Sequence, residues 1–150
     1  MSDPIYRKEV LRLAADAVAA GRLPEPRATG TAHNPSCGDK AVIDLAVTDG
    51  RVTGVAQDTK ACVLSQASAS ILGGAMTGTT EIQIRTLLGQ VKAMLDGGKA
   101  PEGSFAAYAV FDGLAGFKNR HRCVTLPIEA ALAAFENSEA SEKDGKGSKT

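Results

Sequence analysis

The sequence predicts an α+β fold, in which a small antiparallel β-sheet is packed on one face by about four to six helices. Residues 40–57 alternate as a β-hairpin does, and apolar residues at helical spacing occur before and after them. Hydrophobic residues make up 43% and charged residues 23% of the 150 residues, which is the ordinary composition of one folded domain. We therefore expect a single domain over residues 1–136.

A first helix is predicted near the N-terminus. Asp3 can cap it, and Pro4 suits the first helical position. Apolar residues then recur at helical spacing until Gly21 and Pro24, which stop the helix. The segment 22–35 is punctuated by proline and glycine, so we expect it to be extended or looped.

The clearest strand signal follows this segment. Apolar and polar residues alternate over 40–47, with the two-residue period of a strand. Asp49-Gly50 is a strong hairpin-turn signal, and a second strand is expected over 51–57. These residues predict an antiparallel hairpin.

Helical patterns dominate the rest of the chain. The helix after Cys62 is rich in small residues, which allow another element to approach it closely. Thr80 with Gln83 matches a capping box that opens an amphipathic helix. The segment 104–117 is expected to be helical. The last helix is expected to start at Thr125 and Pro127, because proline is well tolerated in the first turn of a helix. We expect the polar residues 137–150 to form a disordered tail.

Charge and hydropathy exclude several classes of partner. The 17 Lys and Arg residues balance the 17 Asp and Glu residues without a basic stripe, so we expect no nucleic-acid partner. No apolar run approaches the roughly 20 residues that span a bilayer, and the charged N-terminus lacks the apolar core of a secretion signal. The sequence therefore predicts a cytoplasmic protein with no membrane partner.

Three cysteines, Cys37, Cys62 and Cys123, are expected at joints between elements: before the hairpin, at a helix start and just before the last helix. An odd number without a secretion signal argues against a disulfide framework. Such thiols bind metal, react, or are simply buried as small hydrophobic groups, and composition alone favours burial. Asp39 lies close behind Cys37, and three thiolates with one carboxylate complete a tetrahedral zinc set. From the spacing alone, a metal site and simple burial of the three cysteines are equally good explanations.

Three motifs narrow these alternatives: Asn34-Pro35-Ser36-Cys37-Gly38-Asp39, then Cys62-Val63-Leu64-Ser65-Gln66-Ala67-Ser68-Ala69-Ser70, then Arg122-Cys123-Val124-Thr125-Leu126-Pro127. They resemble the U-type iron–sulfur cluster assembly family, which includes the IscU scaffolds, the NifU N-terminal domain and SufU. The resemblance covers residues 6–135 and implies that family's fold, with a third strand in the sheet. It is strongest to SufU, because of the serine-rich run after Cys62, the long spacer before Cys123, and Arg122 where IscU scaffolds carry a histidine. Arginine cannot ligate a metal.

The resemblance implies a zinc site made of Cys37, Asp39, Cys62 and Cys123. It also implies that Cys37 accepts persulfide sulfur from a PLP-dependent cysteine desulfurase of the SufS type, whose activity this chain stimulates. In that family a histidine of the docked desulfurase replaces one zinc ligand and frees the accepting cysteine. The sulfur then passes to a downstream cluster scaffold or apo-protein, and PLP belongs to the partner.

Two alternatives stay open, as do the roles of three residues. The chain could be a scaffold on which a [2Fe–2S] cluster is assembled on the same cysteines, or a zinc-stabilised interaction domain without sulfur chemistry. His121 stands where an apolar residue is expected: it either approaches the zinc or its ligands, or is a surface residue, which we favour. Arg120 and Arg122 either dock an acidic surface of the desulfurase or form a solvated basic turn.

Overall fold

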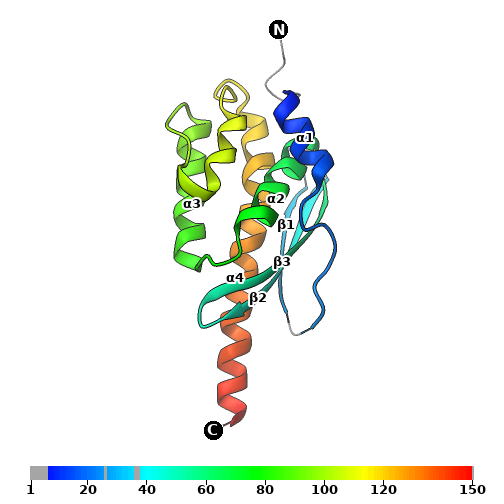
Figure 1. Ribbon diagram of the computed structural model, residues 1–150, viewed down its shortest axis with the longest axis vertical. Helices are drawn as coiled ribbons and strands as arrows, with labels where there is room; N and C mark the ends of the chain where they lie inside the picture. The colour runs from blue at the N-terminus through cyan, green and yellow to red at the C-terminus, as the bar shows by residue number, and fades with distance from the viewer. Residues whose placement is uncertain (1–6, 26, 36–37, 150) are drawn as a thin grey trace.

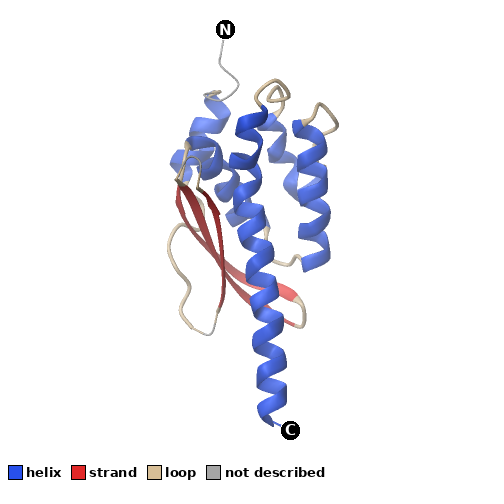
Figure 2. Ribbon diagram, turned by 180° about the vertical axis from the view of Figure 1, so that it is seen from behind, coloured by secondary structure: helices blue, strands red, loops and turns tan. Residues whose placement is uncertain are grey.

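The structure, a computed structural model, describes residues 7–25, 27–35 and 38–149, of which 139–149 by their backbone alone. A three-stranded antiparallel sheet lies against a layer of helices (Figure 1), and the long last helix runs along the sheet (Figure 2). The predicted α+β class and third strand are confirmed. The elements are α1 (Lys8–Asp16), β1 (Ala28–Asn34), β2 (Asp39–Thr48), β3 (Arg51–Lys60), α2 (Val63–Ala75), α3 (Glu81–Leu95), the 3-10 helices η1 (Gly103–Phe111) and η2 (Lys118–Arg120), and α4 (His121–Lys149).

Strand β2 is the centre of the sheet and pairs with β1 and β3. The predicted hairpin turn is confirmed, because Asp49 and Gly50 both have positive φ angles, of 53° and 78°. Strand β1 is the segment that the sequence left as extended or looped. It approaches α4 so closely that a Cβ atom on Gly30 would lie 2.1 Å from the backbone oxygen of Ala130. The missing side chain of Gly30 therefore allows α4 to pack closely on the sheet.

Helix α1 ends at Asp16, earlier than the predicted stop at Gly21. The chain instead pairs with the free edge of β3: the Gln57 N–H donates to the backbone oxygen of Ala19, and the Gly21 N–H to that of Gln57, both at 2.9 Å. Pairing of an otherwise open sheet edge has overridden the helical pattern. The expected cap at residues 3–4 lies outside the described residues.

Helix α4 begins at His121, so the predicted start at Thr125 and Pro127 is wrong. Pro127 lies inside the helix, where its ring nitrogen cannot donate to the backbone oxygen of Cys123. The Ser65 hydroxyl donates to that oxygen instead, at 2.7 Å. The helical backbone continues to Lys149, through the range expected to be a disordered tail, while the domain boundary at residue 136 stays a prediction.

Helix α2 bears out the expectation of close approach. Its Ser68 hydroxyl donates to the backbone oxygen of Val124 in α4 at 2.7 Å. The Tyr108 hydroxyl lies 2.9 Å from the Ser68 hydroxyl. A Cβ atom on Gly73 would lie 2.4 Å from the backbone oxygen of Val18. The predicted capping box of α3 is present, whereas the segment expected to be helical over 104–117 is partly the 3-10 helix η1. Within the described residues, no helix combines the length and the apolar character needed to cross a membrane.

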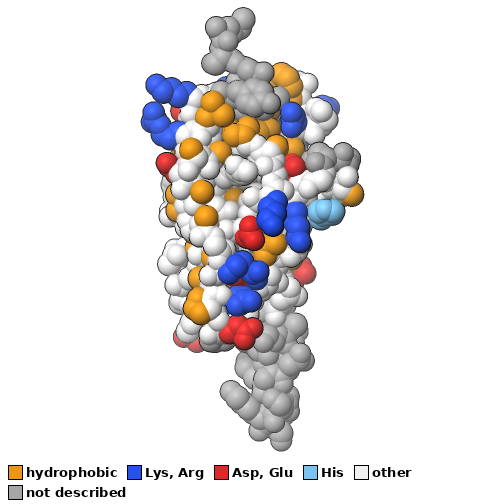
Figure 3. Space-filling view, turned by 90° about the vertical axis from the view of Figure 1, so that its right-hand side faces the viewer, with side chains coloured by type: hydrophobic (Ala, Val, Ile, Leu, Met, Phe, Trp, Pro, Cys, Tyr) orange, Lys and Arg blue, Asp and Glu red, His pale blue; other side chains and the backbone are white. Residues whose placement is uncertain are grey.

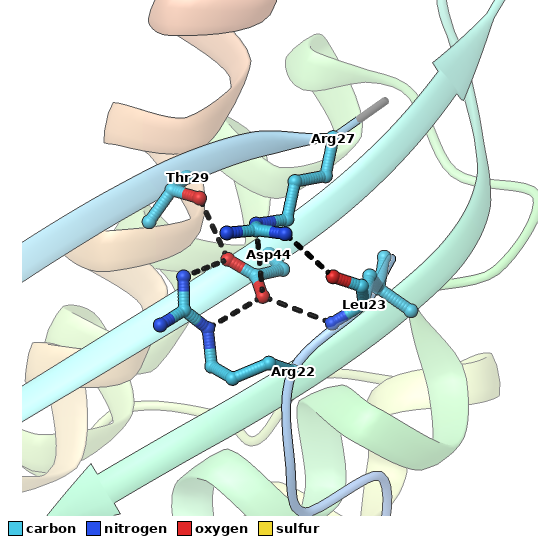
Figure 4. Close-up of polar contacts among 5 residues, drawn as sticks. All are labelled: Arg22, Leu23, Arg27, Thr29 and Asp44. Atoms are coloured by element: carbon cyan, nitrogen blue, oxygen red, sulfur yellow. Dashed lines mark hydrogen bonds and ion pairs between the residues drawn. The ribbon is translucent and has the colours of Figure 1, made fainter. Parts of the chain in front are cut away.

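The face of the sheet opposite the helices is partly covered by the segment before β1. Its anchor is Asp44 of β2, whose carboxylate is fully enclosed (Figure 4). Arg22 donates to both carboxylate oxygens, at 2.7 and 3.1 Å, and the Leu23 N–H and the Thr29 hydroxyl donate at 3.0 and 2.7 Å. Arg27 lies 3.7 Å away. These contacts fix the segment across the outer face of the sheet.

Candidate metal centre

Three chemically reactive side chains from distant parts of the chain meet beside the end of the sheet. Asp39 is the first residue of β2, Cys62 precedes the first turn of α2, and Cys123 lies in the first turn of α4. One carboxylate oxygen and the two sulfur atoms all lie within 4.8 Å of one another. The Cys123 sulfur is 3.7 Å from Asp39 Oδ2. The arrangement is a compact cluster of potential metal ligands.

Each ligand position is fixed by the secondary structure around it. Asp39 pairs with Asn34 at the last position of the β1–β2 ladder, and the strand alternation turns its side chain toward the helices. Cys62 has an extended backbone, φ −66° and ψ 169°, where β3 gives way to α2. Ser65 of α2 joins this residue to α4, since its hydroxyl donates to the Cys123 backbone oxygen and lies 3.9 Å from the Cys62 sulfur.

The cluster is enclosed, and the ion pairs found among the described residues do not include its carboxylate, although Arg120 lies beside Cys123. Asp39 is 6% exposed and Cys123 is 2% exposed, while Cys62 is half-buried. Among the described residues, no Lys, Arg or His forms an ion pair with Asp39. The Cys123 thiol donates a long hydrogen bond to Asp39 Oδ2, and a buried carboxylate so weakly compensated favours a bound cation.

The two thiols do not ionise alike. The pKa of the Cys62 thiol is lowered to about 6, chiefly because the Cys123 thiol donates a hydrogen bond to the Cys62 thiolate. The N–H groups of Ser65 and Leu64 at the start of α2 also lower this pKa, whereas burial and the Asp39 carboxylate raise it. The pKa of Cys123 is raised, first because its thiol donates that hydrogen bond, and then by burial and the nearby negative charges. Cys62 is therefore the thiol that loses its proton first.

The donor set fits zinc. Two ligands of one tetrahedral zinc, at about 2.0–2.3 Å from the ion, lie about 3.3–3.8 Å apart. The 3.7 Å between the Cys123 sulfur and Asp39 Oδ2 agrees with this geometry, and thiolate and carboxylate are both zinc ligands. Three of the four ligands that the sequence predicts, Asp39, Cys62 and Cys123, are thus brought together.

The fourth predicted ligand, Cys37, lies outside the described residues. The residues on either side of it, Asn34 and Gly38, are described. Gly38 has a φ angle of 74°, which favours glycine, and its N–H donates to the backbone oxygen of Asn34 at 2.9 Å. This turn leads directly into Asp39, and the role of Cys37 stays a prediction.

His121 is not part of the cluster. Its side chain is 18% exposed, its Nε2 donates to the backbone oxygen of Leu114 at 2.7 Å, and its Nδ1 lies 3.7 Å from Asp96 Oδ1. The favoured interpretation as a solvated surface residue therefore needs correction, because the ring anchors the start of α4 to the preceding loop. It borders a separate surface pocket of about 430 Å³, lined by Lys92, Leu95, Asp96, Lys118, His121, Arg122, Thr125 and Glu129.

The two flanking arginines differ. The Arg122 side chain points to this pocket and lies 3.3 Å from Glu129 Oε1, with nearly half of its surface exposed. Arg120 is close enough to Cys123 to act as a hydrogen-bond donor that opposes the rise in the pKa of that thiol. Arg120 thus borders the cluster, and the docking role suggested for both arginines stays a prediction.

Sequence reasoning missed Ser65 as a part of the site. It counted this residue among the small side chains of the helix, but the hydroxyl is buried and links the two cysteine-bearing elements. A signal was present: Pro127 comes four residues after Cys123 and leaves the Cys123 backbone oxygen without its helical donor.

Comparisons with known proteins agree on one family. The model of the NifU-like N-terminal domain matches residues 5–124. The N-terminal part of a nitrogen-fixing NifU-like protein from Brucella abortus superposes with a TM-score of 0.86 at 34% identity, over 92% of this chain and 96% of that one. The iron–sulfur cluster assembly scaffold protein IscU of Thermotoga maritima is 27% identical over 132 residues, 88% of this chain and 93% of that protein. FiSufU, a SUF-system protein of Fervidobacterium islandicum, superposes with a TM-score of 0.80 at 19% identity, over 90% of this chain and 99% of that one.

Proposed function

Because the chain belongs to the NifU-like N-terminal domain family, we propose that it acts in iron–sulfur cluster assembly as a zinc-dependent sulfur acceptor. The observation that carries the proposal is the convergence of the Asp39 carboxylate with the thiols of Cys62 and Cys123 within 4.8 Å. The wider role is supported by the resemblance to the IscU protein of T. maritima, which is described as a cluster assembly scaffold.

The described ligands prepare the site for a cation. Asp39 and Cys123 are buried and held by the sheet and by α4, so little ordering remains when an ion binds. The Cys62 thiol already has a lowered pKa, so of the two described thiols Cys123 is the one whose proton binding has to displace. Zinc held here would supply the missing positive charge and keep its thiol ligands deprotonated.

The accepting group in this proposal is Cys37, as the resemblance implies. Its thiolate attacks the outer sulfur of a persulfide on the cysteine of a PLP-dependent desulfurase of the SufS type. The sulfur–sulfur bond of the donor breaks, the donor cysteine leaves as a thiolate, and Cys37 carries the new persulfide without net oxidation. Delivery to a downstream scaffold or apo-protein follows by the same exchange.

The first test is metal analysis of the freshly purified protein with its visible absorption spectrum, after aerobic and anaerobic preparation. We expect about one zinc per chain and no visible band. Purified protein that retains no zinc and binds none when it is added would contradict the proposal.

The second test concerns the acceptor itself. We expect Cys37→Ala to abolish the stimulation of a SufS-type desulfurase and the transfer of ³⁵S from labelled cysteine to this chain. Ser36→Ala is the matched control and should behave as wild type. Full stimulation by Cys37→Ala would remove Cys37 from the mechanism, and would favour an interaction domain in which zinc has a structural role alone.

A second candidate function is a scaffold for a [2Fe–2S] cluster, which the description of the T. maritima relative favours. The same thiols would then bind iron. Iron in the anaerobically purified protein, with a thiolate-to-iron charge-transfer band, would support this function over the first.

A further inference from the structure

Three basic side chains form a row across the sheet at the end nearest the ligand cluster. The pairing register places His33 of β1 opposite Lys40 of β2, and Lys40 opposite Lys60 of β3. All three are exposed. Strand alternation directs them to the face opposite Asp39, because Lys40 is its direct neighbour. We call these three residues the basic row.

The basic row has no evident stabilising role within the chain. Like charges directly opposite each other on a sheet repel, and Lys40 and Lys60 form such a pair. Among the described residues, neither lysine forms an ion pair, although Asp58 lies nearby on the same face. Lysines often protect the free edge of a sheet from aggregation, but Lys40 lies on the central strand, where no edge needs protection.

The row also lies on the open part of the outer face. The other part is closed by the segment that Arg22 and Arg27 fix to Asp44. Figure 3, which views the side of the sheet and of this segment, shows Lys and Arg side chains gathered beside a His, with a few acidic side chains among them. A small hollow of about 40 Å³ lies between the two lysines and is also lined by Val42 and Asp58.

The position of the row relates it to the metal centre. Lys40 follows Asp39 directly, and Lys60 closes the strand that leads to Cys62. The row and the ligand cluster thus lie at the same end of the sheet but on its opposite faces, so a macromolecule has to cover this end of the molecule to contact both.

We propose that the basic row docks an acidic surface segment of the protein that exchanges sulfur with this site. This inference rests on the proposed function, because it assigns the row to the partner of the same site. A carboxylate-bearing protein fits better than a nucleic acid: the chain has no net charge, the row is short, and the sequence has no Trp and little aromatic content for stacking bases. Opposite charges on two binding surfaces accelerate the association of the two proteins and make its rate depend on salt concentration.

The test compares two double charge reversals of the full-length protein. Lys40→Glu/Lys60→Glu reverses the charge of the two lysines of the row. Arg51→Glu/Arg85→Glu makes the same change in net charge at the other end of the molecule, where Arg51 bridges to Thr80 at the start of α3. Zinc content and unfolding temperature are measured for each, to exclude misfolding. The probe is the SufS-type cysteine desulfurase from the same organism, and its association is followed at low and high salt.

We expect the row variant to associate about tenfold more slowly than wild type at low salt and to approach it at high salt, with a flatter salt dependence. The control variant should stay within about twofold of wild type. Equal effects of the two reversals, or none, would overturn the proposal while leaving sulfur transfer by the wild-type chain, and so the proposed function, intact.

A second measurement keeps the inference testable if the desulfurase does not engage the wild-type chain, which would count against the proposed function. A hexaglutamate peptide is titrated into ¹⁵N-labelled protein, and the backbone shifts are mapped. Shifts centred on His33, Lys40 and Lys60 that vanish in the row variant support an acidic ligand. Shifts elsewhere, or tighter binding of an oligonucleotide of equal charge at the row, contradict it.

Discussion

Strand β2 carries two buried carboxylates on opposite faces of the sheet, and their surroundings differ completely. Asp44 on the outer face accepts hydrogen bonds from Arg22, Leu23 and Thr29 and lies next to a second guanidinium. Asp39 on the helix-facing side has two thiols as neighbours, and among the described residues no ion pair. The same strand thus holds one carboxylate that the chain itself neutralises and one for which no ion pair is found among the described residues.

The difference separates a structural carboxylate from one available for binding. Burying a carboxylate is unfavourable unless charge and hydrogen bonds compensate it. At Asp44 the chain itself supplies the compensating charges and hydrogen bonds, and these contacts hold the segment before β1 against the outer face of the sheet. At Asp39 it is incomplete, and the two thiols beside it are potential metal ligands. The comparison yields four predictions, from the largest expected effect to the smallest.

Replacing Asp44 by alanine should cause the largest loss of stability. Arg22 and the Leu23 N–H lose their acceptor inside a covered site, so we expect a decrease of about 3 kcal/mol in the free energy of unfolding. Urea denaturation measures it. Asp112→Ala is the matched control, because Asp112 pairs with Arg7 on the surface and should cost about 0.5 kcal/mol. Equal losses in the two variants would remove the distinction between buried and exposed pairs.

Replacing Asp39 by asparagine should act in two directions. In chelator-treated protein the variant loses an uncompensated buried charge, so the free energy of unfolding should rise by about 1 kcal/mol. Zinc affinity should fall at least about tenfold, because a ligand is removed. Competition with a chromophoric chelator and urea denaturation of the metal-free protein give the two values. Unchanged zinc affinity would take Asp39 out of the metal site.

Replacing Ser65 by alanine tests the link between the two cysteine-bearing elements. The Cys123 backbone oxygen loses the donor that substitutes for the missing N–H of Pro127, so we expect a cost of about 1–2 kcal/mol. Pro127→Ala restores a backbone N–H, and in that background the Ser65 substitution should cost less. A double-mutant cycle by urea denaturation measures the coupling, and strict additivity would show that the two groups do not share this acceptor.

The smallest effect should appear in the pH dependence of stability. Burial raises the pKa of Asp44, but the hydrogen bonds from Arg22, Thr29 and the Leu23 N–H outweigh it, so the net pKa is lowered. A lowered folded-state pKa means that the stabilisation is fully present above the unfolded pKa of about 3.9 and is lost as pH falls through the folded value. The stability difference between wild type and Asp44→Asn should therefore be constant above about pH 5 and shrink below about pH 4. A difference that grows on acidification would contradict the assignment.

Local patterns in the chain predicted much of this fold. Alternation gave β2, the Asp49-Gly50 pair gave the hairpin turn, and Thr80 with Gln83 gave the start of α3. The errors lie where a tertiary contact outweighs a local preference. Helix α1 stops early because the chain pairs with β3, and α4 starts early because Ser65 satisfies the acceptor that Pro127 leaves open.

The site divides in the same way. The sequence by itself determined the ligand types, since thiols and a carboxylate are fixed by Cys62, Cys123 and Asp39, and its motifs indicated the family. Only the tertiary structure decided that these groups meet within 4.8 Å, and that Asp39 is buried without an ion pair among the described residues while Asp44 lies beside two guanidinium groups. It also decided that the His121 ring anchors the start of α4 and stays out of the cluster. The physical reason is that residue type sets the chemistry of a side chain. Distance, burial and the charges around it arise only when segments far apart in the chain pack together.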